Sequence, residues 1–236
     1  MKHILKTQLY TIMIICIFAL YLSFLTIDIY TIHNSTFSSI LKYISILLCF
    51  ILSLLFYQKS TNRKDSRLVC LALLCTLAAD VFLLFGLNQI FGVFLFCIVQ
   101  LIYLRRFSPR NFKIGAYISA SIFLFLSICK IISFSLPTLY IIAGLYAYLI
   151  IACTISTFFT PLPKFNRTCV QVGMILFMLC DLNVALFNTL PSNSGYYHIA
   201  AFSMWLFYLP SQLLLSISSH HGELCQQLSS SSLAKS

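Results

Sequence analysis

Long apolar stretches separated by short polar segments run through almost the whole chain. Eight stretches cover approximately residues 9–27, 39–57, 68–87, 88–104, 114–133, 138–159, 169–187 and 198–218. Each is close to the roughly 20 residues that an α-helix needs to cross the hydrocarbon core of a bilayer. The pattern therefore predicts an all-α integral membrane protein, a bundle of about eight transmembrane helices.

The polar segments between these stretches are too short to form a separate soluble domain. We predict one polytopic membrane domain over residues 1–218 and a flexible, serine-rich cytoplasmic tail over 219–236. The first stretch follows Lys2 and Lys6, as a signal peptide would, but it is longer than a typical signal core. No small-x-small cleavage site follows it closely, so we interpret it as the first membrane helix.

Composition agrees with a membrane protein. Charged residues make up 8% of the chain, against roughly 25% in soluble domains, and the mean hydropathy is +0.96. The ten cysteines are scattered singly through apolar runs, with no CxxC pair and no cysteine–histidine spacing that suits zinc. We interpret them as packing residues and predict neither a metal nor a cofactor.

The basic residues indicate how the chain is oriented. The net charge of +10 does not indicate nucleic-acid binding, because the Lys and Arg residues are divided among short loops instead of forming one patch. If both termini lie in the cytoplasm, all basic residues except Lys42 and Lys130 fall on the cytoplasmic side. This distribution follows the positive-inside rule and predicts a multi-pass protein of the cell membrane.

Two acidic residues interrupt apolar stretches. Asp80 lies in LALLCTLAADVFLLFG and Asp181 in VGMILFMLCDLNVALFN. An aspartate at a helix centre costs about 2.5–3.5 kcal/mol on insertion scales, and such residues usually mark a functional site. Both spans run from the cytoplasmic side outwards, so the two carboxyl groups are expected at one depth, with Thr76 on the face of Asp80 and Asn188 on the face of Asp181. The alternative is that each aspartate is protonated and merely bonds to a neighbouring helix.

Two carboxyl groups in one dry site repel each other when both are ionised. One is then expected to keep its proton while the other stays charged, a division of roles that acid–base hydrolysis needs. On the last span, Pro210 is expected to kink the helix and to free a backbone carbonyl near Ser211 and Gln212.

Three segments resemble the YhhN-like lysoplasmalogenase family of polytopic membrane hydrolases. AADVFLL (78–84) is similar to the family's glycine–aspartate–valine–leucine–leucine segment, with Ala79 in place of the glycine. GMILFMLCDLNVALFN (173–188) is similar to its glycine-x-x-x-phenylalanine-x-x-serine–aspartate segment, with Cys180 in place of the serine. YLPSQLLLS (208–216) resembles the tyrosine and glutamine pair of the last helix.

A fourth segment departs from the family pattern. In FCIVQLIY (96–103), Phe96 and Tyr103 match, but Gln100 stands where the family has histidine. Glutamine can donate and accept hydrogen bonds but does not change charge near neutral pH. If the family histidine carries protons, this departure puts activity in doubt. If it only positions substrate, glutamine can replace it.

The resemblance implies hydrolysis of the vinyl ether bond of a lysoplasmalogen, which releases a fatty aldehyde and a glycerophospho-alcohol. Asp80 and Asp181 would be the catalytic acid and its charge-stabilising partner, as paired carboxylates are in glycosidases. The partner would be a lysophospholipid substrate within the bilayer, with the oligomeric state left open. Its binding residues would be Gln100, Tyr103, Asn188, Tyr208 and Gln212, although Tyr103 and Tyr208 by themselves indicate interfacial aromatics near the inner boundary.

Two other functions fit the same residues. A pair of buried carboxyl groups also suits a proton-coupled carrier of a small solute, although the spans contain few glycines and no basic residue well inside a helix. A non-catalytic membrane protein of the same fold is the third hypothesis, and Gln100 is the main argument for it.

Overall fold

The computed structural model describes the chain except residues 1, 31–35, 111, 134–136 and 221–236. The described part contains eight α-helices long and apolar enough to cross a membrane, which confirms the predicted fold class. They are α1 Lys2–Tyr30, α2 Thr36–Lys59, α3 Arg63–Leu84, α4 Gln89–Phe107, α5 Phe112–Ser133, α6 Thr138–Ser156, α7 Lys164–Thr189 and α8 Gly195–Ile217, with a short 3-10 helix, η1, at Thr157–Phe159.

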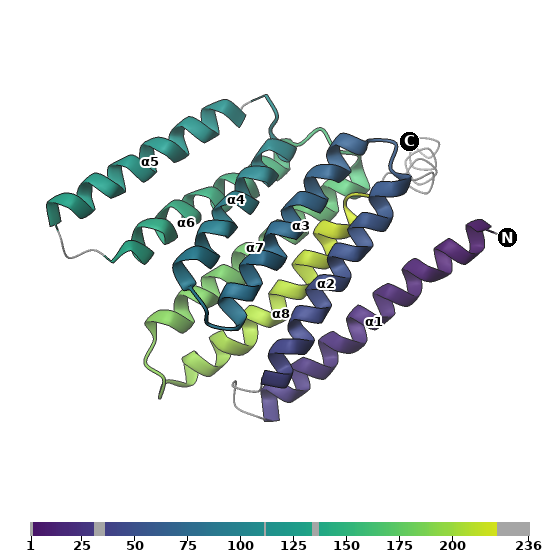
Figure 1. Cartoon of the computed structure of the whole chain (residues 1–236), viewed down its shortest axis with the longest axis horizontal. Helices are drawn as coiled ribbons and strands as arrows, with labels where there is room; N and C mark the ends of the chain where they lie inside the picture. Colours follow the sequence, from purple (N-terminus) through teal and green to yellow (C-terminus); the bar gives the residue numbers. More distant parts are fainter. Residues whose placement is uncertain (1, 31–35, 111, 134–136, 221–236) are drawn as a thin grey trace.

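The helices form one bundle in which α1 and α5 lie at opposite edges (Figure 1). Helices α7 and α8 pack together most extensively, followed by α3 with α4 and α4 with α6. Very little of α5 is buried, so this helix faces lipid along nearly its whole length. The interior of the bundle is therefore enclosed mainly by α2, α3, α4, α6, α7 and α8.

The connection between α3 and α4 is a tight turn over residues 85–88. Gly86 has a φ of 63°, a backbone conformation that residues with a side chain rarely adopt. Asn88 caps α4, since its side-chain oxygen accepts a hydrogen bond from the backbone N–H of Phe91 at 3.1 Å. The turn separates two spans that are nearly continuous in hydropathy, and it holds α3 and α4 side by side.

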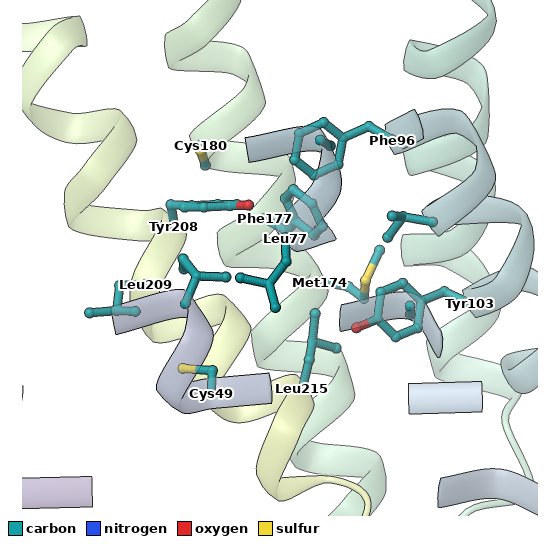
Figure 2. Close-up of a cluster of buried hydrophobic side chains, with 14 of the residues drawn as sticks. Cys49, Leu77, Phe96, Tyr103, Met174, Phe177, Cys180, Tyr208, Leu209 and Leu215 are labelled. Carbon is teal, nitrogen blue, oxygen red and sulfur yellow. The ribbon is translucent and has the colours of Figure 1, made fainter. Parts of the chain in front are cut away.

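Tightly packed apolar side chains fill the interior (Figure 2). Met174, Phe177 and Leu215 are fully buried between α7, α8 and their neighbours. A Cβ atom at Gly173 would lie 3.2 Å from Cγ of Leu215, so this glycine lets α7 and α8 approach closely. None of the nine cysteines in the described residues forms a disulfide, in line with a packing role.

Helix α8 continues through Pro210. Proline has no N–H for the carbonyl four residues earlier, and here that carbonyl belongs to Leu206. It accepts a hydrogen bond from the Tyr21 hydroxyl of α1 at 2.8 Å. The predicted location near Ser211 and Gln212 is therefore wrong by about one helical turn, because the freed acceptor lies before the proline. Of the predicted flexible tail, residues 221–236 lie outside the described residues.

Candidate functional site

Asp80 is buried on α3, with 4% of its surface exposed. The hydroxyl of Tyr208 on α8 donates to both carboxyl oxygens, each at 2.9 Å. Helical side chains lean toward the start of their helix, and α8 runs opposite to α3. Tyr208 therefore lies nearer the level at which α3 begins, and its side chain leans toward the end of α3, where Asp80 lies.

Asp181 lies on α7 and has a tyrosine partner of its own. The Tyr146 hydroxyl of α6 donates to its Oδ2 atom at 2.6 Å. Asp181 keeps some accessible surface, whereas Asp80 keeps almost none. The two aspartates thus share one pattern, a phenol donor from a neighbouring helix, but differ in access.

The two carboxyl groups lie near enough to interact electrostatically. Asp80 and Asp181 each lie 17 residues after the first residue of their helix, which corresponds to about 26 Å along the axis. Phe177 packs against the ring of Tyr208 at 5.8 Å and against Phe96 at 5.9 Å between centroids. Figure 2 shows the rings of Phe96, Phe177 and Tyr208 near one another in the interior of the bundle.

No cation accompanies this pair among the residues that the structure describes, since neither Asp80 nor Asp181 lies within ion-pair distance of Lys, Arg or His. Nor do three or more His, Cys, Asp or Glu side chains gather there as metal ligands would. What the site offers is two carboxyl groups, two phenols and apolar walls.

Gln100 lies next to the Asp181 side of the site. It is fully buried, and its amide lies beside the Tyr146 hydroxyl. Neither amide atom has a partner at hydrogen-bonding geometry among the described groups. Its backbone carbonyl accepts from the Cys153 thiol at 3.0 Å. Gln100, at the family's histidine position, is therefore separated from the Asp181 carboxyl group by one side chain, that of Tyr146.

The other predicted site residues fall into two groups, since Tyr103, Tyr208 and Gln212 lie inside the bundle and Asn188 does not. Tyr103 and Gln212 are fully buried, each with an unpartnered oxygen in the described part of the chain, and neither forms a hydrogen bond to an aspartate. The interpretation of Tyr103 and Tyr208 as interfacial aromatics is wrong, because both rings lie inside the bundle. Tyr103 stacks on Phe107 at 5.6 Å.

Asn188 does not join the site. Its side chain is exposed and donates to the carbonyl of Val184 on its own helix at 2.8 Å. Seven residues return to the same helical face but carry Asn188 about 10 Å farther along the axis than Asp181. The spacing does place both residues on one face of the helix, but the distance along the helix separates them.

Tyr146 was missed by the sequence analysis. It lies in the apolar run AGLYAYLIIA, where one tyrosine looks the same whether it faces lipid or the interior. The packing of α6 on α4 and α7 decides its role, and no local signal identifies that packing. A search for aromatic hydroxyls one helix away from each buried aspartate would have found it only after the bundle was known.

A second buried polar cluster lies where α3 and α7 begin and α4 and α8 end, at the basic end of the bundle. We call it the Arg106 cluster: Asp65, Arg106, Asn166 and Ser218. Arg106 donates to both oxygens of Asp65, at 2.8 and 2.9 Å, and to the hydroxyl and carbonyl of Ser218, at 2.7 and 2.9 Å. Asn166 donates to the same carbonyl at 2.9 Å. Asp65 lies in the buried first turn of α3.

Fold and site together define a polytopic α-helical membrane protein with a cation-free carboxyl pair inside its bundle. The family model of the YhhN family matches residues 37–219, from the start of α2 to just beyond α8, so the chain belongs to the YhhN family. The resemblance stated from the sequence motifs is thereby confirmed. No curated protein and no solved structure matches the chain significantly.

Proposed function

We propose that this YhhN-family protein is a membrane hydrolase that cleaves the vinyl ether bond of lysoplasmalogens. The observation that carries the proposal is the pair Asp80 and Asp181, each hydrogen-bonded to a tyrosine and neither paired with a cation. Carboxyl groups inside a membrane are costly and usually functional. A single-chain lysophospholipid would reach the site from the bilayer itself.

The reaction needs one acid and one charge-stabilising group. A carboxylic acid transfers its proton to the β-carbon of the vinyl ether, and the resulting oxocarbenium ion is stabilised by the second, ionised carboxylate. Water then adds to the cationic carbon and releases a proton, which restores the acid. The hemiacetal so formed collapses to a fatty aldehyde and a glycerophospho-alcohol.

We assign the proton donor to Asp181 and charge stabilisation to Asp80. Asp181 keeps accessible surface, and its one recorded hydrogen bond uses Oδ2 alone. Both oxygens of Asp80 are engaged by Tyr208, and the residue is buried. A group that transfers a proton must meet the substrate, whereas a charge held by a fixed donor acts electrostatically. Gln100 would border the reacting bond, whereas Tyr208 would act through Asp80.

The test is release of free aldehyde by the purified protein in lipid nanodiscs supplied with lysoplasmalogen. We expect aldehyde from the vinyl ether substrate and none from the saturated 1-alkyl analogue, because the latter has no double bond to protonate. Asp181→Asn serves as the matched inactive protein. A preparation that folds correctly but releases no aldehyde above the Asp181→Asn background would contradict the proposal.

The membrane orientation is a proposal of the same standing. The basic end carries Arg63, Arg110 and Lys164 among others, and the opposite end carries Lys42 and Lys130, which supports cytoplasmic termini in the cell membrane. Reporter fusions should place the Arg63, Arg110 and Lys164 segments in the cytoplasm, and residues 86–88 and Ser194 outside. Finding Arg63 and Arg110 on opposite sides would refute this orientation.

A further inference from the structure

Several buried polar atoms inside the bundle have no hydrogen-bond partner among the described residues. Among them are Oγ1 of Thr76, both amide atoms of Gln100, the hydroxyl of Tyr103 and Oε1 of Gln212. All four residues are fully buried. Native proteins leave few such atoms unsatisfied, because each lost hydrogen bond is costly, so each instance calls for a bound partner or a special role.

These atoms lie at graded depths between the Arg106 cluster and the aspartate pair. Helices α4 and α8 run in the same direction, and Arg106 of α4 bonds to Ser218 at the end of α8. Gln100 and Gln212 each precede these bonded residues by six positions, so both lie about 9 Å above them. By the same rise per residue, Tyr103 lies about 5 Å above Arg106.

The series continues toward the carboxyl pair along α3. Asp65 marks the lower level through its bond to Arg106, and Thr76 follows it by eleven residues, or about 16 Å. Asp80 follows one turn later on the same helix. Polar atoms without partners thus recur from the basic end up to the site, whereas other buried hydroxyls, such as those of Thr154 and Ser211, bond to carbonyls of their own helices.

We infer that Thr76, Gln100, Tyr103 and Gln212 bind a file of buried waters linking the Arg106 cluster to the aspartate pair. Water fits because the unpartnered set contains amide donors, amide acceptors and hydroxyls, and water can both donate and accept. A phosphate head group would need a free cation. The nearest, Arg106, already donates four hydrogen bonds to Asp65 and Ser218.

The role of this water rests on the proposed function. Hydrolysis of a vinyl ether consumes one water in each turnover, and the carboxyl pair is enclosed by helices and lipid. A file from the basic end would deliver that water without opening the apolar path used by the substrate chain. Gln100, beside the Tyr146 hydroxyl, would hand water to the Asp181 side.

The binding itself can be tested without activity, by X-ray radiolytic labelling of the intact protein in nanodiscs. Hydroxyl radicals form at bound water and oxidise the side chains beside it. We expect Tyr103 to be oxidised despite its burial, and clearly faster than Phe24, which is equally buried. In the Thr76→Val/Gln212→Leu variant, Tyr103 oxidation should fall about threefold, because two polar partners of the file are gone.

Thr154→Val is the matched control. Thr154 is also buried in the bundle, but its hydroxyl is satisfied by the carbonyl of Ile150 at 2.8 Å, so removing it should leave Tyr103 oxidation unchanged. Equal oxidation of Tyr103 and Phe24 would overturn the inference. So would undiminished Tyr103 oxidation in the double variant, provided that the variant gives the parent's unfolding temperature.

A kinetic measurement separates the two proposals. In the double variant, kcat for aldehyde release should fall while KM stays constant, because water supply and not substrate binding is impaired. Labelled Tyr103 in a parent protein that releases no aldehyde would leave the water file standing and reject the hydrolase. Aldehyde release with Tyr103 unlabelled would reject the file alone.

Discussion

The aspartate pair and the Arg106 cluster are both buried, and both join α3 to α8, but their charges are balanced differently. Asp65 receives two N–H groups from Arg106 at 2.8 and 2.9 Å, so its charge is matched by a cation. Asp80 and Asp181 receive neutral phenol hydroxyls instead. A carboxylate locked to a guanidinium fixes helix positions, whereas one held by a phenol remains free to exchange a proton.

A third cluster follows the Arg106 pattern. Lys42 lies 2.7 Å from Asp28 and 4.8 Å from the centre of the Trp205 ring, and Ser38 donates to the other oxygen of Asp28 at 2.6 Å. Lys42 is buried a turn and a half inside α2, so the expectation of no basic residue inside a span needs this correction. Within the described residues, cations accompany the buried carboxylates Asp28 and Asp65, whereas none accompanies Asp80 or Asp181.

The largest effect on stability is expected from Arg106→Leu. It removes the guanidinium that pairs with the buried carboxylate of Asp65, and breaking a buried ion pair costs about 3–5 kcal/mol of unfolding free energy. Thermal unfolding in detergent measures the loss. Replacing Asp65 by leucine in the same protein should recover most of it, since no charge is then left alone. If Arg106→Leu unfolds at the parent temperature, this cluster does not hold the helices together.

Asp80→Asn and Asp181→Asn should show the opposite behaviour. Asparagine keeps shape and hydrogen bonding but cannot donate a carboxyl proton or carry negative charge, so aldehyde turnover should fall at least about 10²-fold in each. The double variant should lose much less than the product, because groups that act as a unit are not additive. Unfolding temperatures should barely change. Two single variants with nearly parental turnover would show that these carboxyl groups are structural.

The next largest effect is expected from Tyr146→Phe and Tyr208→Phe, which test whether the phenol hydroxyls support the two carboxyl groups. Each removes the hydroxyl that bonds to one carboxyl group, and a bond to a charged group, which Asp80 is throughout and Asp181 becomes when it gives up its proton, is worth about 1.5–3 kcal/mol. We expect kcat to fall about tenfold with KM little changed, since the tyrosines act through the aspartates. Tyr140→Phe on lipid-facing α6 surface is the control. A loss confined to KM would instead indicate that the phenols contact substrate.

The smallest effect is expected at Gln100. If this glutamine positions water or substrate, Gln100→His changes aldehyde release little, whereas Gln100→Leu lowers it through lost hydrogen bonding. If the histidine position carries protons, Gln100→His should raise the rate. Steady-state rates of the three proteins distinguish these outcomes, and three equal rates would remove Gln100 from the site.

Hydropathy predicted the eight spans well, because crossing lipid requires a length and composition that sequence shows directly. It also singled out Asp80 and Asp181, since a carboxyl group inside an apolar run is conspicuous. The hydrogen-bond partners of the buried carboxyl groups were harder to predict from the sequence. Tyr146 looks like any aromatic in a membrane helix, and Asp65 among basic residues looks solvated. Asn188 shares a face with Asp181 but not its depth, because seven residues of helix separate the two by about 10 Å.

The hydrogen bond from Tyr21 to the carbonyl of Leu206 joins the first helix to the last, and α1 precedes the part of the chain that matches the family model. During synthesis the donor in α1 enters the membrane before the acceptor in α8. Helix α8 also brings Tyr208 to Asp80. A chain that has inserted α3 but not yet α8 therefore holds Asp80 in the membrane without its Tyr208 donor.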